Sequence, residues 1–160
     1  MLKKYLICFF ISMVPLIELR LAVPIALSPA YGGALPVVPA YAVCILGNML
    51  PVPFIFFFAR KVLEWGQDKP VIGPFFSFCL KKGEKGGEKL MAKAGRGLFV
   101  ALFLFVGIPL PGTGAWTGTL AASILNMRFR ESVVAVMLGV VLAGIIMGLL
   151  GAGVFGALGL

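Results

Sequence analysis

Three long stretches of the chain contain no charged side chain. They cover residues 21–59, 97–127 and 132–160, in which Asp, Glu, Lys and Arg are all absent. Each stretch exceeds the roughly 20 residues that a helix needs to cross about 30 Å of hydrocarbon. Hydrophobic residues make up 61% of the sequence, whereas soluble domains contain about 45–50%. The sequence therefore predicts an all-α integral membrane protein.

The net charge of +8 is concentrated in one polar segment, residues 60–96, which holds nine of the fourteen lysines and arginines. Such residues accumulate in cytoplasmic loops beside membrane spans, where they meet anionic lipid. We therefore expect a multi-pass protein of the cytoplasmic membrane with a cytoplasmic linker and no binding of nucleic acid. Within the linker, lysines recur every fourth residue at Lys81, Lys85, Lys89 and Lys93. This spacing fits an amphipathic helix on the membrane surface, and a solvated loop fits it equally well.

The residue inventory removes the usual base of most hydrolase mechanisms. The chain has no histidine, which removes His-based zinc sites and Ser-His-Asp triads. Its three cysteines lack the spacing of a metal site or a disulfide framework, and the sequence contains no phosphate-binding loop for ATP. We therefore expect no enzymatic activity, no metal and no cofactor.

The linker divides one transmembrane domain, residues 1–160, into two apolar halves, residues 1–59 and 97–160. Each half starts with a short apolar run, breaks at a proline, resumes, and ends in a long apolar span. Superposing Pro15 on Pro109 aligns the two breaks. Such a weak internal repeat is typical of transporters built from repeated units, and it predicts two pseudo-symmetric halves.

The break in the second half suggests a hairpin that enters and leaves the membrane on the same side. Residues 98–108 and 115–125 each give about 16 Å of helix, which is half of a bilayer. Between them lies the sequence Pro-Leu-Pro-Gly-Thr-Gly. In each half we expect a broken or re-entrant helical hairpin followed by a transmembrane helix, and a single kinked helix is the alternative. The expected breaks fall at Pro15 and Pro24 in the first half and at Pro109 and Pro111 in the second.

The N-terminus has some features of a secretory signal peptide. Lys3 and Lys4 precede an apolar run at residues 5–17, as in a signal peptide. The sequence Glu-Leu-Arg follows in place of a small-residue cleavage site, so we expect the segment to remain. Re-entrant hairpins in both halves would place these lysines opposite the linker, against the usual charge bias. The sequence therefore does not decide the side of the N-terminus.

Glu18 and Arg20 are the only charged residues between positions 5 and 59. At the centre of a bilayer each would cost about 2.5–3.5 kcal/mol. Positions i and i+2 diverge on a regular helix, but an irregular backbone near the prolines would let both side chains face one cavity. We expect Glu18 to exchange a proton or bind a cation, and Arg20 to hold an anionic group or Glu18 itself. The alternative is an interfacial pair that reaches water from a short helix.

A second candidate site lies at the start of the helix that follows the break in the second half. Backbone N–H groups after residues 112–114 would point into the membrane interior and form an anion site. The hydroxyls of Thr113 and Thr117 would add to it, and Trp116 would line the same cavity. The candidate substrate- or ion-binding residues are Glu18, Arg20, Asn48, Gly112, Thr113, Gly114, Trp116 and Thr117.

Small residues form a stripe along the last span. They recur every fourth residue at Gly144, Gly148, Ala152 and Gly156. Such a stripe lets the backbone of a neighbouring helix approach closely. The neighbour would be a helix of the same chain or of a second copy in a homo-oligomer.

Residues 15–24 and 109–118, with Gly47 and Asn48 between them, resemble the small multidrug export family, which is related to the DedA membrane proteins. The likeness covers nearly the whole chain. It implies a fold of two facing re-entrant hairpins, each followed by a spanning helix, and it implies transport as the activity. The DedA relatives are linked to the movement of polyprenyl-phosphate or other lipids across the bilayer under proton-motive force.

The resemblance also implies roles for particular residues. DedA proteins place an acidic residue in the first hairpin, and Glu18 matches it. They place arginines near the second hairpin, where this chain has none before Arg128. Arg20 and the amides of residues 112–114 would therefore have to hold a phosphate group.

These observations favour a secondary transporter of the small multidrug export type that moves an amphiphilic substrate and is coupled to protons or another ion. One alternative is a DedA-like flippase or scramblase of polyprenyl-phosphate or other lipids. Another is a structural membrane protein without transport. The expected partners are membrane lipids and a small amphiphilic or lipid-phosphate substrate.

Overall fold

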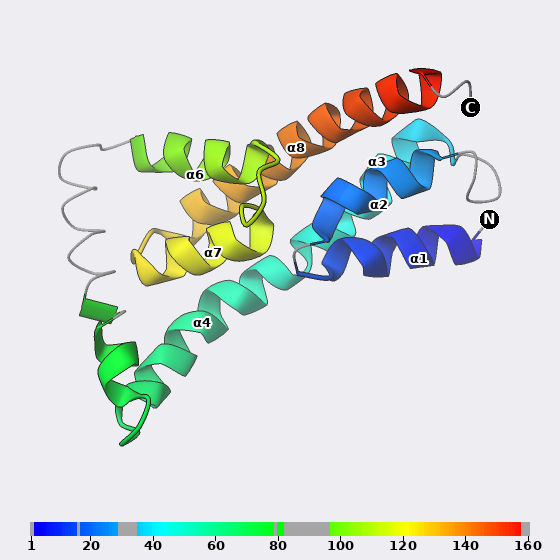
Figure 1. The fold of residues 1–160 in the computed structure, drawn as a ribbon. Helices are drawn as coiled ribbons and strands as arrows, with labels where there is room; N and C mark the ends of the chain where they lie inside the picture. The colour runs from blue at the N-terminus through cyan, green and yellow to red at the C-terminus, as the bar shows by residue number, and fades with distance from the viewer. Residues whose placement is uncertain (1, 16, 29–34, 79, 82–96, 158–160) are drawn as a thin grey trace.

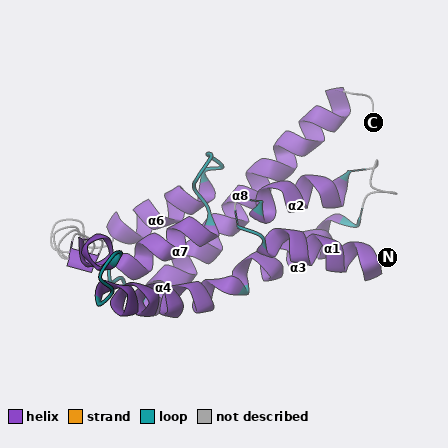
Figure 2. Ribbon diagram, turned by 60° about the horizontal axis from the view of Figure 1, so that its bottom comes forward, coloured by secondary structure: helices purple, strands orange, loops and turns teal. Residues whose placement is uncertain are grey.

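The computed structural model describes residues 2–15, 17–28, 35–78, 80–81 and 97–157, with side chains up to residue 151. This part of the chain consists of helices and connecting turns and contains no strand (Figures 1 and 2). The main helices are α1 (Leu2–Met13), α2 (Glu18–Leu27), α3 (Val37–Met49), α4 (Pro51–Gln67), α6 (Gly97–Gly107), α7 (Ala115–Ile124) and α8 (Phe129–Ala157). Of the predicted lysine stripe in the linker, only Lys81 lies within the described residues.

Two groups of short helices lie at opposite ends of the molecule (Figure 1). At one end α1 packs against α2 and α3, and at the other end α6 and α7 pack against each other. The long helix α8 contacts α6 and α7 as well as α2 and α3, and α4 packs on α7. Each short hairpin therefore packs on a long helix of its own half and on one of the other half.

Two helical segments are long and apolar enough to cross a membrane. They are Val37–Gln67, with 31 residues, and Phe129–Gly151, with 23 residues. The first is divided into α3 and α4 at Leu50, because Pro51 has no N–H to donate and its ring crowds the preceding turn. The sequence thus places spanning-length helices in both halves.

The charge-free stretch at residues 97–127 is not one helix. α6 ends at Gly107 and α7 begins at Ala115, each within one residue of the expected position. The two helices pack side by side. This stretch is therefore a hairpin of two short helices rather than a single kinked helix.

Pro24 does not end a helix, although the sequence suggested a break there. It lies inside α2, where it removes only the hydrogen bond to the carbonyl group of Arg20. Its neighbours Ala22, Val23 and Ala26 are fully buried. Their packing offsets the missing hydrogen bond and keeps the segment helical.

The surface of the described residues carries many more large apolar side chains than that of a soluble protein. Large apolar side chains point outward, and Phe10, Leu46, Phe54, Phe58 and Leu149 are 60–71% exposed. The buried polar residues are Ser12, Glu18, Asn48, Thr119, Ser123 and Ser132. Soluble proteins rarely expose so much continuous apolar surface, whereas lipid solvates it without cost. Together with the two spanning-length helices, this distribution indicates a membrane protein.

Glycines provide the closest helix contacts at both ends of the molecule. A Cβ atom on Gly47 of α3 would collide with the carbonyl oxygen of Phe9 in α1. A Cβ atom on Gly139 of α8 would lie 2.8 Å from the carbonyl oxygen of Phe103 in α6. Phe9 and Phe103 are 94 residues apart, the same separation as the two proline breaks that the sequence aligns. In each half, a glycine of the third helix therefore packs against the backbone of the first helix.

The stripe of small residues on α8 faces α3 of the same chain at two of its four positions. The hydroxyl group of Tyr41 donates a hydrogen bond of 2.9 Å to the carbonyl oxygen of Gly144. A Cβ atom on Gly148 would collide with that hydroxyl oxygen. Ala152 and Gly156 lie beyond residue 151, the last residue whose side chain the structure describes. Contact with a second copy through this stripe stays a prediction.

Candidate functional site

The break between α1 and α2 gives Glu18 an unusual backbone conformation. Residues 14–17 join the helices, and Pro15 among them cannot donate a backbone hydrogen bond. Glu18 begins α2 with a φ of +50°, which lies in the left-handed region that side chains other than glycine seldom adopt. Such a conformation persists only where the surroundings hold it. It fixes the direction in which the Glu18 side chain leaves the start of α2.

The Glu18 carboxylate caps the N-terminus of α7, which belongs to the other half. Oε2 accepts a hydrogen bond of 3.1 Å from the Ala115 N–H, and Oε1 accepts one of 3.0 Å from the Trp116 N–H. The first N–H groups of a helix have no partner within the helix and carry partial positive charge. Glu18 is only 4% exposed, so these two amides take the place of water as partners of its carboxylate oxygens. The predicted anion site at the start of α7 is thus filled by the predicted coupling residue.

The carboxylate lies against Gly114 so closely that only glycine fits there. A Cβ atom on Gly114 would lie 2.7 Å from the Glu18 Cδ. Gly114 also has a φ of +142°, whereas Gly112 has a φ of +83° with open space around it. Gly112 is therefore needed for backbone conformation alone, and Gly114 is needed for both conformation and space.

Arg20 binds the break of the second hairpin rather than Glu18. Its Nη2 donates a hydrogen bond of 2.6 Å to the Thr113 Oγ1, and its Nη1 donates to the carbonyl oxygen of Leu110. The Thr113 hydroxyl also lies 2.9 Å from the Leu110 carbonyl oxygen. Within the described residues, Arg20 and Glu18 form no ion pair. Because a guanidinium group has five N–H donors, Arg20 keeps donors for another ligand.

Trp116 makes the reverse connection from the second hairpin to the first. Its indole Nε1 donates a hydrogen bond of 3.1 Å to the carbonyl oxygen of Met13, the last residue of α1. The ring also lines an apolar cavity of about 350 Å³ between α4 and α7, together with Ile55, Phe58 and Leu120. Each broken hairpin therefore satisfies backbone groups of the other one.

The structure does not bring Thr117 to the Glu18 carboxylate. Its hydroxyl lies 3.5 Å from the carbonyl oxygen of Gly114, within its own turn. The other predicted residue, Asn48, is 2% exposed near the end of α3, and its Oδ1 has no hydrogen-bond partner in the described structure.

Thr119 is a polar residue of this region that the sequence reasoning missed. It is fully buried, and its Oγ1 has no hydrogen-bond partner within the described residues. It lies one turn after Ala115 on the same face of α7. A buried unpaired polar group costs about 1–3 kcal/mol, so a ligand, ion or water that binds there would gain that energy. The available signal was a further hydroxyl, besides those of Thr117 and Ser123, in a helix without charged residues.

The described part of the chain contains no group of three or more His, Cys, Asp or Glu side chains able to hold a metal ion. The chemistry available at the two breaks is a carboxylate that can be protonated, a guanidinium group and the amides of α7. Such groups bind and release protons and anions.

An apolar exterior and a buried carboxylate between two broken hairpins are the features of a helical membrane protein. The model of the family described as "Putative small multi-drug export protein" matches residues 18–146, and the chain belongs to this family. The match includes Glu18, Asn48 and the start of α7. Neither a curated protein nor a solved structure matches the chain. Membership in an export family points to a transporter rather than an enzyme.

Proposed function

We propose that the protein is a multi-pass secondary transporter of the cytoplasmic membrane, which moves an amphiphilic substrate and is coupled to protons at Glu18. One observation carries this proposal: a buried carboxylate from the first half holds the helix N-terminus of the second half. Ionisable residues inside a membrane protein are costly and mark ion and proton pathways.

Protonation of Glu18 would weaken the contact between the halves. A neutral carboxyl group is a poorer acceptor than a carboxylate, because charge-assisted hydrogen bonds are about twice as strong as neutral ones. Release of the carboxyl group would free the amides of Ala115 and Trp116 for an anionic group of the substrate. Arg20 lies beside them on Thr113. Uptake of a proton and binding of the anion would therefore occur together, which is the basis of coupling.

The helix packing supports two pseudo-symmetric halves with re-entrant hairpins. Gly47 and Gly139 contact equivalent positions of α1 and α6, as an internal repeat requires. α6 and α7 have 11 and 10 residues, enough for about half of a bilayer each. Their meeting point carries Pro109 and Pro111, and the carbonyl groups of Ile108 and Leu110 beside these prolines need protein partners at that depth. Arg20 and Thr113 are such partners.

The surroundings of the two breaks fit an amphiphilic substrate. The cavity beside Trp116 is lined almost entirely by apolar side chains of α4 and α7, whereas the amides and Arg20 on the other side offer positive charge. A substrate with an apolar body and an anionic group would contact both. A flippase for lipid phosphates, the activity that a resemblance to DedA proteins would imply, is the second candidate, because helix N-termini and arginine are common phosphate ligands.

Transport in proteoliposomes tests the proposal. We expect an inward proton gradient to drive accumulation of an amphiphilic anion such as fluorescently labelled phosphatidic acid, and a protonophore to abolish it. Ethidium, an amphiphilic cation, serves as the comparison. It should move more slowly, because the groups proposed to bind the substrate, the amides of Ala115 and Trp116 and the guanidinium group of Arg20, carry positive charge. If neither probe moves under a proton gradient of either direction, the protein is not a proton-coupled transporter, and the structural alternative gains support.

The unpaired hydroxyl of Thr119 gives a second prediction. Valine has the shape of threonine without the hydroxyl, so Thr119→Val removes a buried unsatisfied group and should stabilise the protein by about 1 kcal/mol. If the hydroxyl binds the substrate or an ion during transport, the same variant should transport about tenfold more slowly, since one hydrogen bond contributes roughly 1.4 kcal/mol. Thermal unfolding and initial uptake rates measure the two effects. Unchanged uptake would remove Thr119 from the site.

A further inference from the structure

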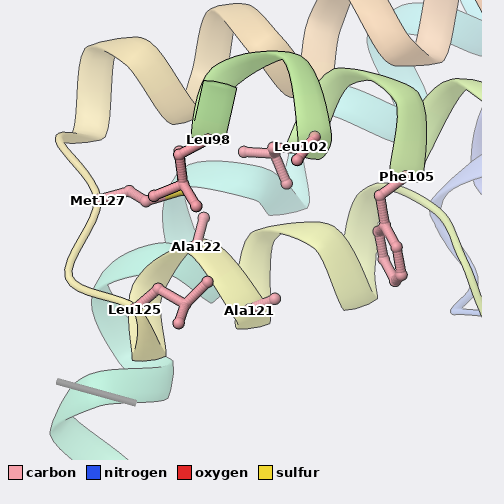
Figure 3. A pocket seen from close by; sticks show the side chains of 8 residues that line it. Leu98, Leu102, Phe105, Ala121, Ala122, Leu125 and Met127 are labelled. Atoms are coloured by element: carbon pink, nitrogen blue, oxygen red, sulfur yellow. The ribbon is translucent and has the colours of Figure 1, made fainter. Parts of the chain in front are cut away.

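A separate apolar cavity opens between α6 and α7 (Figure 3). Its volume is about 240 Å³. Leu98, Leu102, Ala122 and Met127 form a buried floor, and Ala101 and Phe105 are exposed at its edge. The side chains around it are apolar, so the cavity offers room for a hydrocarbon segment and no partner for a polar group.

Positive charge lies directly beside one end of this cavity. Met127 on its wall is followed by Arg128, whose side chain is 81% exposed, and Arg130 is exposed as well. Arg128 contacts the Glu131 carboxylate at 3.3 Å, but exposed ion pairs contribute little and the guanidinium group has further donors. The first N–H groups of α8 add partial positive charge at the same place.

The same end of the molecule has the marks of a membrane interface. The Arg60 side chain donates a hydrogen bond of 2.6 Å to Asn126, which lies just after the end of α7. Just beyond the end of α4, the Lys69 amine lies 4.5 Å from the centre of the exposed Trp65 ring. Arginine, lysine and tryptophan concentrate at the level of the lipid headgroups. The cavity therefore extends from headgroup level into the apolar part of the protein.

We propose that this cavity binds one acyl chain of a resident anionic phospholipid, with its phosphate group at Arg128 and the first turn of α8. An acyl chain matches the apolar lining, and the phosphate matches the cation at its end. The cytoplasmic leaflet supplies anionic lipids of this kind. The lipid would hold α6, α7 and the start of α8 together, away from the Glu18 contact and independently of transport.

Native mass spectrometry of the full chain tests this site. The protein is purified in detergent that contains equal amounts of phosphatidylglycerol and phosphatidylcholine. We expect wild-type protein to retain a single phosphatidylglycerol in preference to phosphatidylcholine. Arg128→Gln should lower this retention about fivefold, the effect of one basic residue near the membrane surface. Lys3→Gln removes an exposed charge outside the proposed site and should leave it unchanged.

A second pair of variants tests the position of the acyl chain. Ala101→Phe adds a ring at the exposed edge of the cavity and should abolish retention by filling it. Ala42→Phe places the same ring on an exposed position of α3 and should have no effect. Equal retention of both lipids by the wild type would overturn the proposal, and so would unchanged retention in Arg128→Gln or in Ala101→Phe. None of these substitutions contacts Glu18 or α7's first turn, so the outcome is separate from that of the transport proposal.

Discussion

Glu18→Gln should abolish transport driven by a proton gradient while the protein still folds. Glutamine has nearly the same shape as glutamate, but its amide group does not take up and release a proton as a carboxylate does. Its single side-chain oxygen can replace only one of the two carboxylate oxygens, so its NH₂ group would face the other N–H donor, that of Ala115 or Trp116. The variant should therefore lose about 1–3 kcal/mol of stability in addition to coupling. Uptake of labelled phosphatidic acid with and without the proton gradient measures the loss.

A matched control separates this effect from a general effect of removing a carboxylate. Glu131→Gln changes the exposed partner of Arg128 and should keep full activity. Glu18→Asp keeps the carboxylate but shortens the side chain, so partial gradient-driven uptake is expected. A folded Glu18→Gln variant, monodisperse and helical by circular dichroism, that still responds to the gradient would show that coupling does not pass through Glu18.

Gly114→Ala should destabilise the protein far more than the same change at Gly112. Both residues have positive φ, so each substitution strains the backbone by about 1–2 kcal/mol. The added methyl group at Gly114 must also displace the Glu18 carboxylate from the amides of α7, whereas it meets nothing within 4 Å at Gly112. We expect the free energy of unfolding to fall by about 3–5 kcal/mol for Gly114→Ala and by about 1–2 kcal/mol for Gly112→Ala.

Thermal unfolding in detergent, followed by circular dichroism, compares the two glycine variants. A double-mutant cycle with Glu18→Ala then assigns the difference to the carboxylate. Once the Glu18 side chain is truncated, Gly114→Ala should lose only about as much stability as Gly112→Ala does. Equal losses at the two glycines in the native background would contradict the contact between Gly114 and Glu18.

The helices of the second hairpin follow from local sequence signals. The apolar run before Pro109 and the glycines after Pro111 place the end of α6 and the start of α7 within one residue of the observed bounds. Proline and glycine act on neighbouring backbone groups, so their effect is visible in the sequence. The same reasoning failed at Pro24, because burial of the surrounding small residues sustains α2 across a missing hydrogen bond.

The pairing of the two breaks could not be predicted in the same way. The sequence marks Glu18 as an ionisable residue in an apolar segment and the start of α7 as an anion site, as two separate features. The Glu18 carboxylate occupies the anion site through a contact between residues that are 97 positions apart in the sequence. The hydrogen bond from Trp116 to Met13 joins residues 103 positions apart, and that from Arg20 to Thr113 joins residues 93 positions apart. Such contacts depend on tertiary packing, which the spacing of apolar and polar residues in the sequence does not predict.

The reciprocal hydrogen bonds between the breaks have a consequence for biosynthesis. The carbonyl group at the end of α1 receives its partner only when Trp116 has been made, and the Glu18 carboxylate receives its partners at the same point. Until about three quarters of the chain has left the ribosome, the first hairpin therefore carries unsatisfied polar groups that lipid cannot solvate. The nascent first half should therefore remain in a protected or partly hydrated environment beside the insertion machinery until α7 has been synthesised. Fragments that end before α7 should be recognised and degraded as orphaned membrane segments.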